Sequence, residues 1–124
     1  MKRILVVDHE QDLLDAVSDY FGDRYEVTTV SSAATAVDAF RCRRPDIVFL
    51  DVNMPGGSGV DTLARLRELD ASVPVVMVTL DMQVGVAESC LDLGAFAYVP
   101  RPIDLGYMEH VAAVASGITG DRRI

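Results

Sequence analysis

Five short apolar runs alternate with five longer segments of helical periodicity, and this alternation constrains the fold more than any other feature of the sequence. The runs are residues 3–7, 25–30, 46–50, 73–79 and 96–99. Three of them are nearly continuous in Val, Ile, Leu, Phe or Met, which is typical of strands buried on both faces of a parallel sheet.

The segments between the runs predict amphipathic helices at residues 10–22, 32–43, 60–69, 83–93 and 104–116. Ser32 and Asp104 can cap the starts of their helices, and Gly22 and Gly94 can end theirs. In the last helix, Tyr107 is expected to face the core together with the other apolar residues.

Five strand–helix units joined by right-handed crossovers predict an α/β fold. We expect a doubly wound, five-stranded parallel sheet of flavodoxin-like order 2-1-3-4-5, in three α/β/α layers. The 124-residue chain suits one domain. We assign residues 1–120 to it and residues 121–124 to a C-terminal tail or the start of a linker.

Composition excludes several classes of function. No apolar run approaches the roughly 20 residues of a membrane span. The net charge of −8 argues against nucleic-acid binding, because phosphate contacts need a basic surface. Cys42 and Cys90 lack metal-ligand spacing and are expected to be reduced thiols, as in a cytoplasmic protein.

Polar residues follow the predicted strands where a doubly wound sheet binds its ligands. They are Asp8, His9, Glu10, Asp51, Thr79 and Arg101. Asp8 or Glu10 could merely cap a helix, and Arg101 could be a solvated loop cation. Asp51 is harder to dismiss, because it precedes the next helix by several residues. Like charges gathered there cost on the order of 4 kcal/mol per close pair, so such a cluster usually serves a cation or a reaction.

Four motifs, VVDHE, DIVFLDVNMPGGSG, VVMVT and AYVPRP, occur in this order and spacing. Together they resemble the response regulator receiver domain over essentially the whole chain. The resemblance implies that a histidine kinase or phosphotransfer protein phosphorylates Asp51, giving an aspartyl phosphate. It implies that Thr79 contacts the phosphoryl group with Arg101, and that Tyr98 is the aromatic residue whose rotamer switches.

The same resemblance implies a Mg²⁺ site made by Asp8, Asp51 and the main-chain carbonyl of Asn53, with Mn²⁺ as an alternative ion. It also implies a cis Arg101–Pro102 bond and an output surface on the fourth helix, fifth strand and fifth helix. A domain of this kind catalyses at most its own phosphorylation and dephosphorylation. The glycine-rich loop at 56–59 lets the backbone turn beside Asp51.

Three positions depart from the family pattern. His9 replaces the second acid, and it is expected to weaken Mg²⁺ binding and make it pH-dependent, or else to point to solvent. Arg101 replaces lysine, which keeps the charge but changes the geometry. Leu80 replaces a small residue and is expected to narrow access. Glu10 could swing inward to compensate for His9, although the first turn of the helix suits its charge.

Two functions of different classes therefore remain open. The first is a phosphoacceptor with an altered metal site, and the second is a degenerate receiver that binds partners without phosphorylation. A haloacid-dehalogenase-type phosphatase would need Asp-x-Asp, whereas Asp51 is followed by Val52 and Asn53. A dinucleotide enzyme would need G-x-G-x-x-G after the first strand, which is absent.

Overall fold

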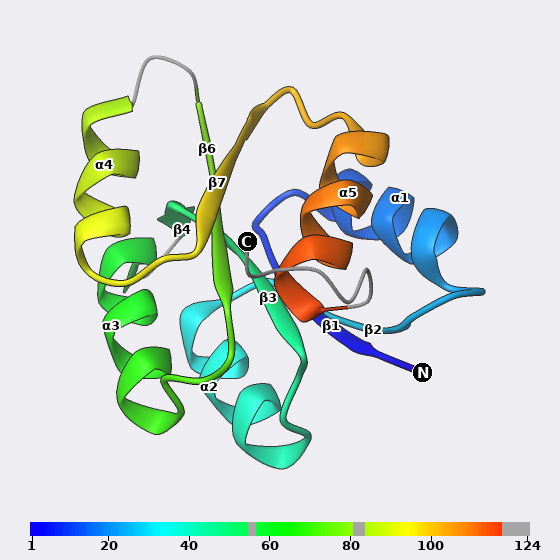
Figure 1. The fold of residues 1–124 in the computed structure, drawn as a ribbon, viewed down its shortest axis with the longest axis horizontal. Coiled ribbons are helices and arrows are strands. Elements are labelled where there is room, and N and C mark those ends of the chain that lie inside the picture. The colour runs from blue at the N-terminus through cyan, green and yellow to red at the C-terminus, as the bar shows by residue number, and fades with distance from the viewer. Residues whose placement is uncertain (55–56, 81–83, 118–124) are drawn as a thin grey trace.

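A five-stranded parallel sheet in the order β2-β1-β3-β6-β7 forms the centre of the molecule (Figure 1). The computed structural model describes residues 1–54, 57–80 and 84–117. The sheet strands are β1 (Arg3–Val7), β2 (Glu26–Val30), β3 (Ile47–Asp51), β6 (Val75–Leu80) and β7 (Ala97–Arg101). Because β6 and β7 are the fourth and fifth long strands, the expected order 2-1-3-4-5 is confirmed.

Five helices cover the two faces of this sheet and complete the three layers (Figure 1). They are α1 (Gln11–Phe21), α2 (Ala33–Cys42), α3 (Gly59–Leu69), α4 (Val84–Asp92) and α5 (Leu105–Ser116). Buried residues of α1 and α5 belong to one core cluster, and those of α2, α3 and α4 belong to the other. The helix layers therefore hold two and three helices.

Side-chain alternation along the inner strands explains why the apolar runs are continuous. On β1, Leu5 and Val7 pack in the cluster with α2 and α3, whereas Ile4 and Val6 pack in the cluster with α1 and α5. Successive side chains of a strand point to opposite faces. Both faces of this sheet are covered, so every position of an inner strand needs an apolar residue.

The helix ends follow the sequence signals with one difference. Ser32 Oγ accepts a hydrogen bond from the Thr35 N–H at 3.2 Å, and the Asp104 carboxylate accepts one from the Tyr107 N–H at 3.1 Å. Gly94 has a φ of 102°, which suits its place after α4. Gly22 instead ends α1 with a φ of −60°, so a left-handed glycine is not needed there.

Two features differ from the sequence-based expectations. Tyr107 is 48 % exposed, so its assignment to the core was wrong. The helix packs on the sheet through Met108, Val111 and Ala112, and Tyr107 lies about 100° from Met108 around the axis, at the edge of that stripe. A short antiparallel hairpin was also not anticipated, formed by β4 (Asn53–Met54) and β5 (Gly57–Ser58).

Several expectations concern residues outside the described ranges. They include the tail at 121–124, Gly56 of the glycine-rich loop, and the side chain of Leu80. Cys42 is exposed and Cys90 is buried, and both are free thiols as expected. Within the described ranges, no helix has both the length and the apolar character that a membrane crossing requires.

Candidate functional site

The polar residues expected at the carboxyl ends of the strands lie together at one edge of the sheet. Asp51 is the last residue of β3 and stands opposite Val78 of β6, which places Thr79 one residue further along the same edge. Arg101 is the last residue of β7, and Asp8 follows β1 directly. The sheet order brings these strand ends side by side, so the sequence-based expectation of convergence is confirmed.

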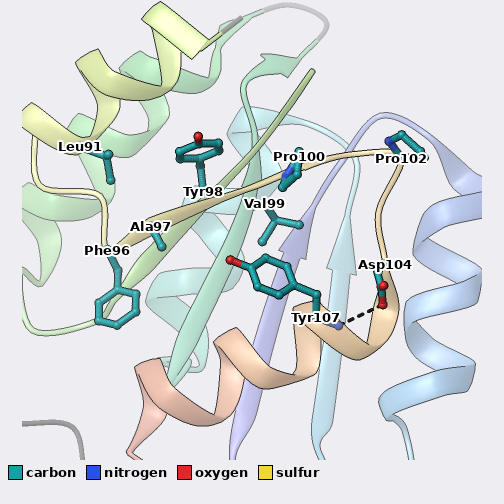
Figure 2. A pocket seen from close by; sticks show the side chains of 9 residues that line it. All are labelled: Leu91, Phe96, Ala97, Tyr98, Val99, Pro100, Pro102, Asp104 and Tyr107. Carbon is teal, nitrogen blue, oxygen red and sulfur yellow. Dashed lines mark hydrogen bonds between the residues drawn. The ribbon is translucent and has the colours of Figure 1, made fainter. Parts of the chain in front are cut away.

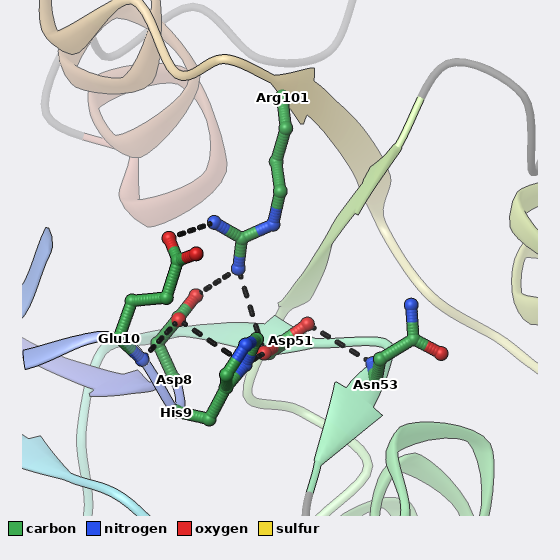
Figure 3. A network of polar contacts seen from close by, with 6 residues as sticks. All are labelled: Asp8, His9, Glu10, Asp51, Asn53 and Arg101. Carbon is green, nitrogen blue, oxygen red and sulfur yellow. Dashed lines mark hydrogen bonds and ion pairs between the residues drawn. The ribbon is translucent and has the colours of Figure 1, made fainter.

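The two oxygens of the Asp51 carboxylate have different surroundings (Figure 3). Oδ1 accepts a hydrogen bond from the Asn53 N–H at 3.0 Å. Oδ2 lies 2.5 Å from His9 Nδ1 and 3.5 Å from an Arg101 guanidinium nitrogen. The residue is only 1 % exposed. The backbone therefore holds Oδ1, while Oδ2 faces the side chains that carry or can carry positive charge.

Arg101 connects the acids of this edge to one another (Figure 3). One guanidinium nitrogen donates to Asp8 Oδ2, and another donates to Glu10 Oε1 at 3.2 Å. The side chain is 14 % exposed. Burial by itself lowers the pKa of the Arg101 guanidinium, but the carboxylates of Asp8, Asp51 and Glu10 raise that pKa on balance. Arg101 is thus a fixed cation that offsets the charge of the cluster.

Keeping Asp8 ionised in this cluster costs free energy. Burial raises the pKa of its carboxyl group, and the nearby charge of Asp51 adds to this. The Glu10 N–H, which donates to Asp8 Oδ1 at 2.9 Å, and the Arg101 guanidinium oppose the shift without reversing it. A buried carboxylate retained against this cost is typical of a functional site.

His9 lies against Asp51, although its side chain remains 40 % exposed. Its Nδ1 is 3.7 Å from Asp8 Oδ1, which is further than the 2.5 Å to Asp51 Oδ2. The hydrogen bond with Asp51 raises the pKa of the His9 imidazole above its usual value. The contact between His9 and Asp51 was not predicted from the sequence. The predicted strand order could have indicated it, because β1 and β3 are neighbours and their carboxyl ends lie side by side.

Glu10 does not serve the first turn of α1, which was one of the two places expected for its carboxylate. It is the residue that precedes α1, and it makes no side-chain capping hydrogen bond. Its carboxylate turns to Arg101 instead of serving the first turn of the helix. The physical reason is that Arg101 offers a charged hydrogen bond, which is stronger than the attraction of an exposed acid to a helix dipole.

The side chains of Asp8, His9 and Asp51 lie close enough together to coordinate one metal ion. One ligand atom from each lies within 4.8 Å of the others. The two carboxylates are the hard oxygen ligands that Mg²⁺ prefers, so they fit the ion that receiver domains bind. The imidazole of His9 does not fit it as well, because this ligand suits Zn, Cu, Ni or Fe. Arg101 already contacts both carboxylates.

The backbone approaches closely beside Asp51. A Cβ atom at Gly59 would lie 2.3 Å from the carbonyl oxygen of Asp51 and 2.6 Å from Val52 Cα. The Gly59 N–H donates to the Val52 carbonyl at 2.9 Å. Glycine therefore lets α3 begin directly against the end of β3. The Arg101–Pro102 peptide bond is cis, as expected.

Tyr98 lies on β7 and lines a groove rather than the acid cluster (Figure 2). This hollow, the α4–β7–α5 groove, has a volume of about 770 Å³. Its lining includes Leu91, Phe96, Tyr98, Pro100, Asp104 and Tyr107. The groove occupies the surface that the sequence analysis expected to serve output.

Comparison with known proteins agrees with this geometry. The family model "Response regulator receiver domain" matches residues 4–113. The chain belongs to this family. The receiver domain of NtrX from Brucella abortus has a similar structure, with a TM-score of 0.86 and 31 % identity, over 91 % of this chain and 97 % of that one.

Curated relatives of this receiver domain include longer regulatory proteins. The regulatory protein AtoC of Escherichia coli is 33 % identical over 85 % of this chain and 23 % of its own length. The probable transcriptional regulatory protein TcrX of Mycobacterium tuberculosis is 37 % identical over 82 % of this chain and 44 % of its own. The chain thus spans less than half of the length of both relatives.

Proposed function

We propose that this receiver domain accepts a phosphoryl group on Asp51 from a histidine kinase or a phosphotransfer protein. The observation that carries the proposal is the setting of the Asp51 carboxylate. It is buried at the end of β3, the Asn53 N–H holds one oxygen, and the other oxygen faces Arg101. Preorganised donors around a carboxylate favour its reaction with a group that brings in negative charge.

The reaction would form an acyl phosphate. Oδ2 of Asp51 attacks the phosphorus of a phosphohistidine, and the phosphorus–nitrogen bond breaks with its electron pair left on the donor's imidazole nitrogen. His9 must leave Oδ2 before this attack, because its Nδ1 occupies the approach to that oxygen. Arg101 and the hydroxyl group of Thr79 then hold the phosphoryl oxygens. Positioning and charge stabilisation supply most of the catalysis of phosphoryl transfer.

A divalent cation completes this proposal. Mg²⁺, or Mn²⁺ in its place, would be held by the carboxylates of Asp8 and Asp51 and by the main-chain carbonyl of Asn53. When bound, the ion offsets negative charge on the transferred group. Arg101 must release Asp8 to some extent, because its guanidinium occupies the oxygen that faces the site.

The partners follow from this role. The domain would meet a histidine kinase or phosphotransfer protein at the acid cluster, and an output partner or effector domain at the α4–β7–α5 groove. We propose that it acts in the cytoplasm, that it does not bind nucleic acid directly, and that it catalyses only its own phosphorylation and dephosphorylation. The acidic balance of the chain supports the absence of phosphate-backbone contacts.

One observation favours a second function. His9 replaces an acid and contacts Asp51 Oδ2 directly, which would block both a metal ion and the attacking oxygen. A degenerate receiver, which binds partners without phosphorylation, would retain such a contact permanently.

The test is the intact mass of the domain after treatment with acetyl phosphate, with and without Mg²⁺ or Mn²⁺. We expect a gain of one phosphoryl group in the native chain and in Asp61→Asn, which changes an exposed acid of α3. Asp51→Asn is expected to show no gain. A gain that persists in Asp51→Asn would place the acceptor elsewhere, and no gain under any condition would favour the degenerate receiver.

A further inference from the structure

Basic residues are distributed very unevenly along the chain. Residues 68–121 contain a single Lys or Arg, which is Arg101, whereas they contain many acids. Arg101 is committed to Asp8 and Glu10 in the acid cluster. The segment that builds α4, β7 and α5 therefore has no other Lys or Arg of its own, and a neighbouring cation is Arg67 of α3, beside Gly94 and Phe96.

The same region gathers the exposed apolar side chains. Within the described residues, the large hydrophobic side chains that are exposed, apart from Met1, are Leu91, Leu93, Phe96 and Tyr107. Leu91, Phe96 and Tyr107 all line the α4–β7–α5 groove (Figure 2). Apolar side chains concentrated at one hollow indicate a binding surface, whereas scattered ones do not.

The border of this groove is acidic. Asp104 lines the groove, and its carboxylate accepts a hydrogen bond from the Tyr107 N–H at 3.1 Å. Glu88 and Asp92 do not line the groove but are exposed on α4, and Glu88 lies one turn before the lining residue Leu91. Glu109 of α5 is turned away from this border, because it pairs with Arg24 at 3.0 Å beside α1.

A second copy of the chain fits this surface poorly. A two-fold symmetric dimer places the same patch of each copy against its equivalent. The acids of this face would then lie near those of the other copy, and juxtaposed like charges oppose association. Among the described residues, Arg67 of α3 reaches this side of the molecule, but it lies against Gly94 and already donates to the Ala71 carbonyl. A partner with basic residues around apolar ones would satisfy both features of the groove.

We propose that the α4–β7–α5 groove binds an amphipathic segment of a different protein, whose apolar side chains are flanked by Lys or Arg. The apolar residues would enter the hollow beside Phe96 and Tyr107, and the cations would face Glu88, Asp92 and Asp104. In helix-in-groove binding, an amphipathic helix places apolar anchor residues along one face into a hydrophobic groove. This inference rests on the proposed function, because it names the chemistry of the output partner assigned there.

The experiment measures fluorescence anisotropy of two labelled helical peptides with the whole unphosphorylated chain. One peptide consists of Leu at helical spacing with Lys, and the other has Glu in place of each Lys. We expect the Lys peptide to bind roughly 10-fold more tightly than the Glu peptide. Equal binding of both peptides, or no binding of either, would overturn the proposal.

Two double variants with the same change in net charge test whether the acids of α4 attract the Lys peptide specifically, or whether any acidic surface of the protein would. Glu88→Lys with Asp92→Lys changes α4, whereas Asp12→Lys with Asp19→Lys changes the exposed face of α1. The α4 variant is expected to bind the Lys peptide roughly 10-fold more weakly, and the α1 variant to lose far less. Equal loss in both variants would overturn the proposal.

The state of association and the phosphorylation assay complete the design. Sedimentation velocity is expected to show a monomer, and a dimer that Phe96→Ser abolishes would assign the groove to a second copy and overturn the proposal. The peptides are tested on unphosphorylated chain, so a failure of Asp51 to accept phosphate leaves their result standing. Phosphorylation without peptide binding would reject the groove partner alone.

Discussion

Arg101 and His9 shape the acid cluster at the scale of single residues. The Arg101 guanidinium contacts Asp8, Glu10 and Asp51, and His9 Nδ1 contacts Asp51 Oδ2. Both side chains stand where a divalent cation would otherwise balance the carboxylates. A divalent cation that enters this site must therefore compete with these two side chains for the carboxylates.

The first prediction concerns His9→Asp, which we expect to bind Mg²⁺ at least roughly 10-fold more tightly than the native chain. The added carboxylate supplies a hard oxygen and removes a group that is cationic when protonated. The hydrogen bond with Asp51 raises the pKa of His9, so protonation begins at a higher pH than for a free imidazole. Native affinity should therefore fall between about pH 8 and about pH 6. Calorimetric titration at both pH values measures this.

His9→Gln is the matched control for charge, because it removes the titrating group without adding a carboxylate. We expect it to bind Mg²⁺ with less pH dependence than the native chain and without the gain of His9→Asp. Buried Asp8 also takes up a proton on acidification, but all three proteins share that contribution. Equal affinities of the native chain and His9→Asp would show that His9 does not disturb the site.

The second prediction is that Asp8→Asn stabilises the metal-free domain at neutral pH. Burial raises the pKa of Asp8 in the folded state, so the folded chain binds this proton more tightly than the unfolded chain. The ionised carboxylate therefore costs stability at neutral pH. That cost disappears as the pH falls below about 4, where the carboxyl is protonated in both states. Asparagine keeps an oxygen that can accept the Glu10 N–H.

Denaturant unfolding at neutral and acidic pH measures this effect. The midpoint of Asp8→Asn should exceed that of the native chain at neutral pH and approach it at acidic pH. Asp19→Asn, at an exposed position of α1, should leave the midpoint nearly unchanged. A lower midpoint for Asp8→Asn at neutral pH would mean that attraction to Arg101 outweighs the cost of burial.

At the scale of secondary-structure elements, the start of α3 determines how the loop after β3 closes. Gly59 is the first residue of α3, and its N–H bonds to the Val52 carbonyl. Ser58 caps the same helix by accepting the Val60 N–H at 3.1 Å. The start of α3 is thus bonded to the residue that follows β3, next to Asn53, whose N–H donates to Asp51 Oδ1.

The third prediction is that Gly59→Ala destabilises the domain by about 1–3 kcal/mol or more. Its Cβ would meet backbone atoms of Asp51 and Val52, which cannot rotate away as a side chain can. Gly85→Ala is the matched control on α4, because a Cβ there meets no atom of the described residues within 4 Å. That variant should be neutral or slightly more stable, since alanine favours a helix. Equal stability of Gly59→Ala and the native chain would contradict the close approach.

At the scale of the whole molecule, β7 contributes both Arg101 of the acid cluster and Tyr98 of the α4–β7–α5 groove, and it pairs with β6, which carries Thr79. In the register of β6 and β7, Thr79 stands opposite Pro100, and Met77 stands opposite Tyr98. Tyr98 also packs against the core cluster that contains residues of α3 and α4. A change at Thr79 therefore has a short, packed route to the groove.

The fourth prediction is that Tyr98→Ala separates phosphorylation from output. Asp51 should still gain a phosphoryl group, because Tyr98 lines the groove and packs against the core cluster that contains residues of α3 and α4. Phosphorylation should no longer change the affinity of the groove for the Lys peptide, whereas in the native chain it should. Tyr107→Ala is the control. It should weaken binding of the Lys peptide both with and without phosphorylation, and phosphorylation should still change the affinity. A persistent change in Tyr98→Ala would place the switch elsewhere.

The sequence by itself determined the architecture of this protein. Its apolar runs alternate with amphipathic segments, and a strand such as β3 that is apolar throughout must be covered on both faces. Strand order then brings Asp8, Asp51 and Arg101 to one edge. Local signals such as Ser32 and Asp104 act within a few residues, so their capping roles were also predictable.

Only the tertiary structure decided where individual side chains point. His9 lies on Asp51, Glu10 turns to Arg101, and Tyr107 faces outward beside the groove. Each depends on the path of a loop or on the rotation of a helix about its axis, and neither is encoded in the spacing of residues. Contacts between distant segments form only after the core has set the distance and angle between their elements.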